Sequence, residues 1–110
     1  MSKDITINII DRKGIFHEVQ APTDMNLNLM ELIRMYELAE EGTIGICGGM
    51  AMCASCQCYV LNDVLKTERN DDEEAMLLEA YHVKDNSRLG CQILITEEID
   101  GLAIEIAPEQ

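Results

Sequence analysis

The sequence predicts a small α+β domain, and three observations support this class. The chain has 110 residues, of which 47% are hydrophobic and 26% are charged, so it is long enough for one domain with a modest core. Apolar residues alternate near the start of the chain, as in β-strands, whereas two internal segments repeat apolar residues at helical spacing. A glycine-rich stretch without either period follows the first helical segment. The predicted order is therefore β-β-α-loop-β-α-β-β, in one domain over residues 1–110.

A β-hairpin is predicted at the N-terminus. Ile5, Ile7 and Ile9 alternate with polar residues over 4–10. The sequence Asp-Arg-Lys-Gly then makes a turn, and residues 15–21 return as a second strand. This start has no long apolar core and no small-residue cleavage site, so we expect a strand rather than a signal peptide.

The first helix is predicted over 28–41. Asn28 and Glu31 have the spacing of a capping box, and Gly42 can end the helix. One buried stripe is expected, formed by residues at the spacing i, i+3, i+4 and i+7: Leu29, Leu32, Ile33 and Tyr36. The loop that follows extends to Cys56, and a short strand is expected at 59–61.

A second helix is predicted over 71–83, with a capping box formed by Asn70 and Glu73. Four consecutive acids occupy its first turn, where the helix dipole favours negative charge. Its inner face would consist of Met76, Leu77, Ala80 and Tyr81. Two further strands are expected, at 88–95 and 102–107.

The charge balance excludes some classes of partner. There are 21 Asp and Glu against 8 Lys and Arg, which gives a formal net charge of -13. A protein with this charge lacks the positively charged surface that binding to nucleic acids or anionic membranes requires, but its acidic surface suits a basic protein partner. No apolar run approaches the roughly 18 residues of a membrane span, so we expect a cytoplasmic chain.

The cysteines point to a metal or redox site. Four of the five lie within twelve residues, and an odd number in a reducing cytosol disfavours structural disulfides. Cys47, Cys53, Cys56 and Cys91 have the spacing C-x5-C-x2-C followed by a distant Cys. Four thiolates suit either zinc or an iron–sulfur cluster, and the three-plus-one layout favours the cluster. Small residues would let the loop backbone approach the sulfides: Gly48, Gly49, Ala51, Ala54 and Ser55.

With these motifs the sequence resembles the adrenodoxin/putidaredoxin-type [2Fe–2S] ferredoxins. The resemblance rests on the stretches CGGMAMCASC (47–56) and DNSRLGCQI (85–93), together with Asp100-Gly-Leu, and it covers nearly the whole chain in element order. It implies a β-grasp fold, with a mixed sheet crossed by the 28–41 helix, and one [2Fe–2S] cluster. It also implies a one-electron carrier rather than an enzyme, and no catalytic triad or phosphate loop is visible in the sequence.

The resemblance further implies a role for each ligand and a set of partners. Cys47 and Cys53 would bind the iron nearer the surface, and Cys56 and Cys91 the inner iron. A flavoprotein reductase would supply the electron to a monomeric carrier. The acceptor would be either the iron–sulfur assembly machinery or a cytochrome P450. In the resembled family an acidic helix docks these partners, and the matching residues here are Asp71, Asp72, Glu73 and Glu74.

Two apolar positions and one cysteine distinguish this chain within the family. Leu78 and Ile46 replace acidic residues of other members, and we expect them to form an apolar patch in the docking surface. Cys58 follows Cys56 by two residues and is expected to be a free thiol, which either packs as a small hydrophobe or serves sulfur transfer. Some assembly ferredoxins carry a cysteine here, so we favour iron–sulfur assembly over P450 support.

Overall fold

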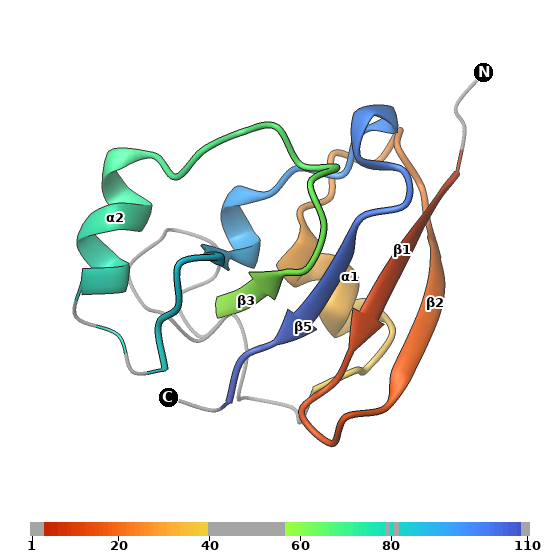
Figure 1. The fold of residues 1–110 in the computed structure, drawn as a ribbon. Coiled ribbons are helices and arrows are strands. Elements are labelled where there is room, and N and C mark those ends of the chain that lie inside the picture. The colour runs from red at the N-terminus through yellow and green to blue at the C-terminus, as the bar shows by residue number, and fades with distance from the viewer. Residues whose placement is uncertain (1–3, 40–56, 79, 81, 109–110) are drawn as a thin grey trace.

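The computed structural model describes residues 4–39, 57–78, 80 and 82–108, which form a mixed five-stranded sheet with two α-helices (Figure 1). The strand order is β2 (Phe16–Ala21), β1 (Ile5–Ile10), β5 (Ala103–Ile106), β3 (Gln57–Val60) and β4 (Ser87–Leu89). The neighbours β1 and β5 are parallel, and the other neighbouring strands are antiparallel. Helix α1 (Leu29–Met35) lies across one face of the sheet. The predicted α+β class with a mixed sheet and a crossing helix is therefore confirmed.

The N-terminal hairpin follows the predicted pattern. β1 pairs with β2 (Phe16–Ala21), with Ile7 opposite Val19. Ile5, Ile7 and Ile9 of β1 point into the core, because successive side chains of a strand alternate between its two faces. The carboxylate of Asp11 accepts bonds from the N–H groups of Lys13 and Ile15 at 2.9 and 3.0 Å, and Gly14 has a φ of +80°. These local bonds explain why the chain reverses here.

Helix α1 begins as predicted and ends earlier than predicted. The Asn28 side chain accepts from the Glu31 N–H at 2.8 Å, and the Glu31 carboxylate accepts from the Asn28 N–H at 3.1 Å, which completes the capping box. The helix stops at Met35 because Glu37 adopts a left-handed φ of +55° and the Leu38 N–H bonds back to the Ile33 carbonyl at 3.1 Å.

Of the four residues predicted to form the inner stripe of α1, three are buried, and Met30 is buried beside them. Leu29, Leu32 and Ile33 are fully buried against the sheet, whereas Tyr36 is 42% exposed and donates its hydroxyl to the Gln20 carbonyl at 2.7 Å. Each fully buried aliphatic side chain contributes about 1.5–3 kcal/mol by leaving water. This layer is the main core of the described residues, and it extends along β1 and β5 through Ile7 and Ile104.

In the C-terminal half, the helix and strands have different bounds from those predicted. β3 spans Gln57–Val60, and α2 spans Asp71–Leu78, which is shorter than the predicted 71–83. The predicted strand 88–95 consists of β4 (Ser87–Leu89), followed by the 3-10 helix η1 (Gly90–Gln92). A second 3-10 helix, η2 (Glu97–Ile99), precedes β5. None of the helices in the described part of the chain is long and apolar enough to cross a membrane.

The break in the 88–95 segment has a physical cause. The Ile93 N–H bonds to the Gly90 carbonyl at 3.2 Å, which closes η1. Beyond it, the Leu29 N–H bonds to the Ile93 carbonyl and the Ile95 N–H bonds to the Leu27 carbonyl, each at 2.9 Å. Ile93 and Ile95 are thus buried against the start of α1 instead of extending β4.

Candidate metal centre

One predicted cluster ligand lies within the described residues. Cys91 is the middle residue of η1 and is only 6% exposed. The side-chain amide of Gln92 donates to its Sγ at 3.4 Å. An N–H group directed at a buried sulfur suits a thiolate, which accepts hydrogen bonds more strongly than a thiol does. The position therefore fits a cysteine that binds iron.

The other predicted ligands fall in the segment 40–56, which is outside the described residues. The same holds for the loop residues expected to surround the cluster and for one expected contact residue: Cys47, Cys53, Cys56, Gly48, Gly49, Ala51, Ala54, Ser55 and Ile46. The described chain resumes at Gln57, directly after this segment, and Gln57 pairs with Leu89 between β3 and β4. The cysteine-rich segment therefore leads into a strand whose partner ends two residues before Cys91.

A buried ion pair connects α2 to the strand that leads to Cys91. The guanidinium of Arg88 donates to the Glu73 carboxylate at 2.8 Å from Nε and at 3.0 Å from Nη2. The same carboxylate accepts from the Leu89 N–H at 3.0 Å, and Arg88 Nη1 also donates to the Thr67 carbonyl at 2.8 Å. Glu73 is fully buried, and Arg88 is 7% exposed. Such a bidentate pair positions β4, and with it the start of η1.

This geometry corrects the predicted docking surface. Glu73 was expected to contact partners together with the other three acids of the first turn, but a side chain with 0% exposure cannot do so. Sequence reasoning also missed Arg88. The capping-box spacing identified the backbone role of Glu73, whereas its pairing with a residue fifteen positions later depends on the fold.

The remaining acids of α2 face outward. Asp71, Asp72 and Glu74 are exposed, and the Glu74 carboxylate lies 3.6 Å from Arg69 Nη1, a loose surface pair. Leu78 is 84% exposed, which agrees with the expectation that it does not belong to the buried face of the helix. The outward acids and the exposed Leu78 therefore lie on a helix that the Arg88–Glu73 pair joins to β4, the strand that leads to Cys91.

Cys58 is fully buried in β3, opposite Arg88 on one side and Ile106 on the other. Its thiol is free, and burial raises its pKa to about 12. A thiol in this state carries almost no thiolate at neutral pH, and the thiolate is the form that attacks sulfur or binds metal. Packing is therefore the better interpretation of Cys58.

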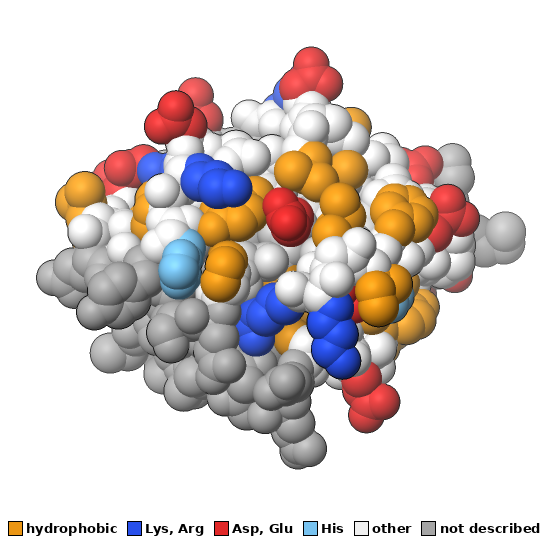
Figure 2. Space-filling model, turned by 60° about the horizontal axis from the view of Figure 1, so that its bottom comes forward, with side chains coloured by type: hydrophobic (Ala, Val, Ile, Leu, Met, Phe, Trp, Pro, Cys, Tyr) orange, Lys and Arg blue, Asp and Glu red, His pale blue; other side chains and the backbone are white. Residues whose placement is uncertain are grey.

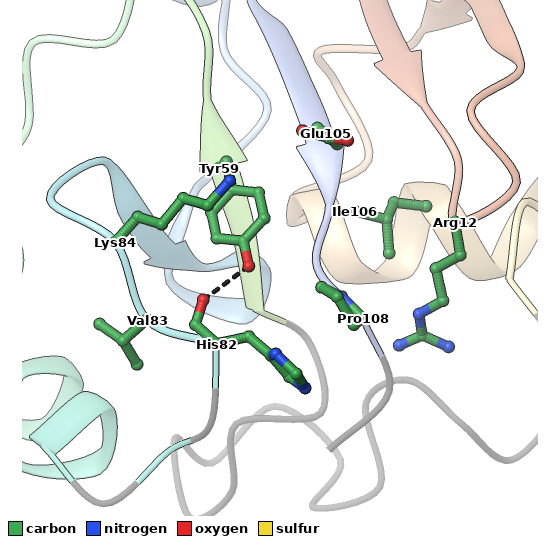
Figure 3. Close-up of a pocket in the computed structure, with 8 residues that line it drawn as sticks. All are labelled: Arg12, Tyr59, His82, Val83, Lys84, Glu105, Ile106 and Pro108. Atoms are coloured by element: carbon green, nitrogen blue, oxygen red, sulfur yellow. Dashed lines mark hydrogen bonds between the residues drawn. The ribbon is translucent and has the colours of Figure 1, made fainter.

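A pocket of about 530 Å³ opens where β3 begins and β5 ends (Figure 3). In it the Tyr59 hydroxyl donates to the His82 carbonyl at 2.6 Å, and Lys84 Nζ lies 4.3 Å from the centre of the Tyr59 ring. Across the pocket Arg12 Nε donates to the Ala107 carbonyl at 2.8 Å. Figure 2 shows basic and histidine side chains on this face, interleaved with apolar ones. The Tyr59 bond joins β3 to the segment before β4, and the Arg12 bond joins the turn after β1 to the end of β5, so we assign the pocket a structural role.

Comparison with known proteins agrees with these features. The chain is 34% identical over 108 residues to a 2Fe-2S ferredoxin of Rickettsia conorii, covering 96% of this chain and 92% of the relative. It is 39% identical over 71 residues to putidaredoxin of Pseudomonas putida, covering 61% of this chain and 65% of the relative. No protein-family model matches the sequence.

Solved structures show the same similarity. A putidaredoxin variant superposes with a TM-score of 0.82 at 29% identity, covering 96% of this chain and 98% of that one. Putidaredoxin in a covalent complex with putidaredoxin reductase gives 0.78 at 30% identity, with 96% and 99% covered. An ISC-like [2Fe–2S] ferredoxin from Pseudomonas putida gives 0.76 at 25% identity, with 96% and 94% covered.

The β-grasp sheet, the buried Cys91 on η1 and the ferredoxin relatives together place the chain among small iron–sulfur proteins that carry electrons rather than among enzymes. With relatives above 30% identity over almost its full length, the chain belongs to the putidaredoxin-type [2Fe–2S] ferredoxins, whose members hold one [2Fe–2S] cluster.

Proposed function

We propose that this protein carries one electron at a time on a [2Fe–2S] cluster bound by Cys47, Cys53, Cys56 and Cys91, with Cys91 closing the site from η1. The observation that carries the proposal is the buried Sγ of Cys91, which accepts a hydrogen bond from the Gln92 side chain at the position where the cysteine motif requires the fourth ligand. The free thiol of Cys58 also supports a reducing, cytoplasmic setting.

The proposed electron source is an NAD(P)H-dependent flavoprotein reductase. Its docking surface would be the outward acids of α2, namely Asp71, Asp72 and Glu74, with Leu78 and Ile46 as apolar contacts. The similarity to putidaredoxin in its reductase complex supports this class of partner. Complementary charge between the two surfaces would accelerate their encounter.

The proposed acceptor is the iron–sulfur assembly machinery. The fold shared with an ISC-like [2Fe–2S] ferredoxin supports it. A second candidate is a cytochrome P450 or a related oxygenase, which the 39% identity to putidaredoxin favours. Because Cys58 is buried, either role would depend on electron delivery rather than on sulfur transfer through that thiol.

Absorbance tests the cluster and its ligands. We expect the purified protein to be red-brown, to bleach on reduction by dithionite, and to contain two iron atoms per chain. Cys91→Ser should change or abolish the visible spectrum, whereas Cys58→Ser, a matched substitution at a buried cysteine, should leave it intact. A colourless protein with bound zinc would reject electron carriage in favour of a structural metal site.

The docking surface is tested by charge reversal. Asp71→Lys/Asp72→Lys should slow reduction by the native reductase about tenfold at low salt and less at high salt, because exposed charges act mainly on association. The matched control is Glu97→Lys/Glu98→Lys, which makes the same charge change at exposed acids on η2. Equal effects of the two variants would show that net charge, rather than this surface, determines the rate.

The acceptor is tested by offering the reduced protein to both classes of partner. Faster oxidation by a purified assembly complex than by an oxygenase from the same source would support the first proposal. The opposite order of rates would support the second candidate.

A further inference from the structure

We propose that Gln92 positions a hydrogen-bond donor on the sulfur of Cys91, that Asn70 at the start of α2 fixes the orientation of this donor, and that the pair raises the reduction potential of the site. This inference rests on the proposed function in one respect, since it takes Cys91 to be a cluster ligand. It assigns roles to two residues that the cysteine motif does not contain.

Three hydrogen bonds form a continuous chain from the backbone of α2 to the sulfur. The Glu73 N–H donates to Asn70 Oδ1 at 2.8 Å. Asn70 Nδ2 donates to Gln92 Oε1 at 2.9 Å. Gln92 Nε2 donates to Cys91 Sγ at 3.4 Å, which is an ordinary distance for a hydrogen bond to sulfur.

The direction of these bonds follows from the helix. A backbone N–H can only donate, so the Asn70 atom that receives the Glu73 N–H must be the carbonyl oxygen. The Asn70 amide nitrogen then faces Gln92 and requires an acceptor, which places the Gln92 oxygen toward Asn70. The Gln92 nitrogen is left facing the sulfur. The capping of α2 therefore determines that a donor, rather than an acceptor, points at Cys91.

A hydrogen-bond donor on Cys91 Sγ changes the reduction potential of the bound cluster. When bound, the cluster accepts and returns one electron, and its negative charge is greater by one in the reduced state. The Gln92 N–H stabilises negative charge on the sulfur in both states and more in the reduced state, which raises the potential. No bond breaks at Gln92, and its protons stay in place. The net charge of -13 lowers the potential, so this donor opposes the field of the protein.

The same contact connects the site to the docking helix. Asn70 is exposed and immediately precedes Asp71 and Asp72, the acids proposed to meet the reductase. The N-terminus of α2 thus contributes both charge toward the partner and the residue that orients the donor on Cys91.

The test is a potentiometric titration of the cluster-loaded protein, with dithionite as reductant and redox mediators. Gln92→Leu removes the donor. Asn70→Ser keeps a good N-cap for α2 but removes the amide that orients Gln92. Both should lower the one-electron reduction constant by about threefold to tenfold, where tenfold corresponds to about 59 mV. The visible spectrum should stay that of a [2Fe–2S] protein.

Asn28→Ser is the matched control, because Asn28 caps α1 through the same kind of capping box and its side chain accepts from the Glu31 N–H. It should leave the potential unchanged. A potential equal to wild type in both Gln92→Leu and Asn70→Ser, with the cluster present, would overturn the inference. If Gln92→Leu fails to hold a cluster, Asn70→Ser alone decides. Failure of the proposed function is distinguishable, since then Cys91→Ser would keep the wild-type spectrum.

Discussion

The substitution Glu73→Gln tests how far the buried ion pair stabilises the protein. It keeps the size of the side chain and removes its charge, so Arg88 remains buried without a compensating anion. A glutamine can present only one oxygen. Its NH2 group would face Arg88 Nη2 in one orientation, and both Arg88 Nε and the Leu89 N–H in the other, because these groups donate to the two carboxylate oxygens at 2.8 to 3.0 Å. Two donors would then oppose each other in a site without access to water.

The expected cost follows from the burial of both partners. Removing one member of a buried pair costs about 3–5 kcal/mol, because the other charge stays desolvated. The entropy of unfolding for a chain of 110 residues is about 0.23 kcal/mol/K. The substitution should therefore lower the unfolding midpoint by about 13–22 °C.

The assay compares unfolding midpoints from circular dichroism with the loss of visible absorbance, at one heating rate, because cluster loss makes unfolding irreversible. Glu74→Gln is the matched control. It removes the next carboxylate along the same helix turn, which has a side-chain exposure of 54% and only a loose contact with Arg69. It should cost no more than about 0.5 kcal/mol, or roughly 2 °C.

A double variant measures the energetic coupling between Glu73 and Arg88. In Glu73→Gln/Arg88→Met the buried cation is gone, so the midpoint shift should be clearly smaller than the sum of the two single shifts. Equal shifts for Glu73→Gln and Glu74→Gln, or additive shifts in the double variant, would refute the reasoning that this pair is buried and coupled.

Three further predictions concern other buried or bonded groups. Cys58→Ser should lower stability by about 1–3 kcal/mol, because it buries a hydroxyl. In the native wild type, mass spectrometry after iodoacetamide treatment should find Cys58 unmodified, because burial raises the pKa of its thiol to about 12. The hydrogen bond from His17 holds the pKa of Asp11 below its usual 3.8, so the stabilisation is present above that pH and lost below it; Asp11→Asn should flatten the acid side of the stability–pH curve measured by urea unfolding. Tyr59→Phe, which removes the hydroxyl bound to the His82 carbonyl, should cost about 1 kcal/mol and abolish a late phenolate step in an alkaline absorbance titration, since burial raises the pKa of Tyr59.

The elements that local rules determine were predictable from the sequence. Both capping boxes are present, at Asn28 and at Asn70, because a side chain three residues away needs no tertiary contact to complete them. The β1–β2 hairpin is likewise set by alternation and by the turn at Asp11. Spacing along the chain is sufficient in such cases.

The elements that long-range contacts determine were not predictable. The end of α1 was missed for a different, local reason: Glu37 adopts the left-handed conformation that ends the helix, and no glycine stands at that position to signal it. The change from β4 to η1 depends on Ile93 and Ile95 pairing with the segment before α1, more than sixty residues earlier. A pattern within a short sequence window cannot contain this second contact.

The four acids at the start of α2 show why a charge run alone does not define a docking surface. Local rules place all four in the first turn, where the helix dipole favours them equally. Tertiary structure then divides them: Glu73 turns inward and is neutralised by Arg88, whereas its neighbours stay in solvent. A neutralised pair adds little to the long-range field that a partner meets. Reversing the charge at Glu73 would therefore measure folding, and only the outward positions, Asp71, Asp72 and Glu74, report on docking.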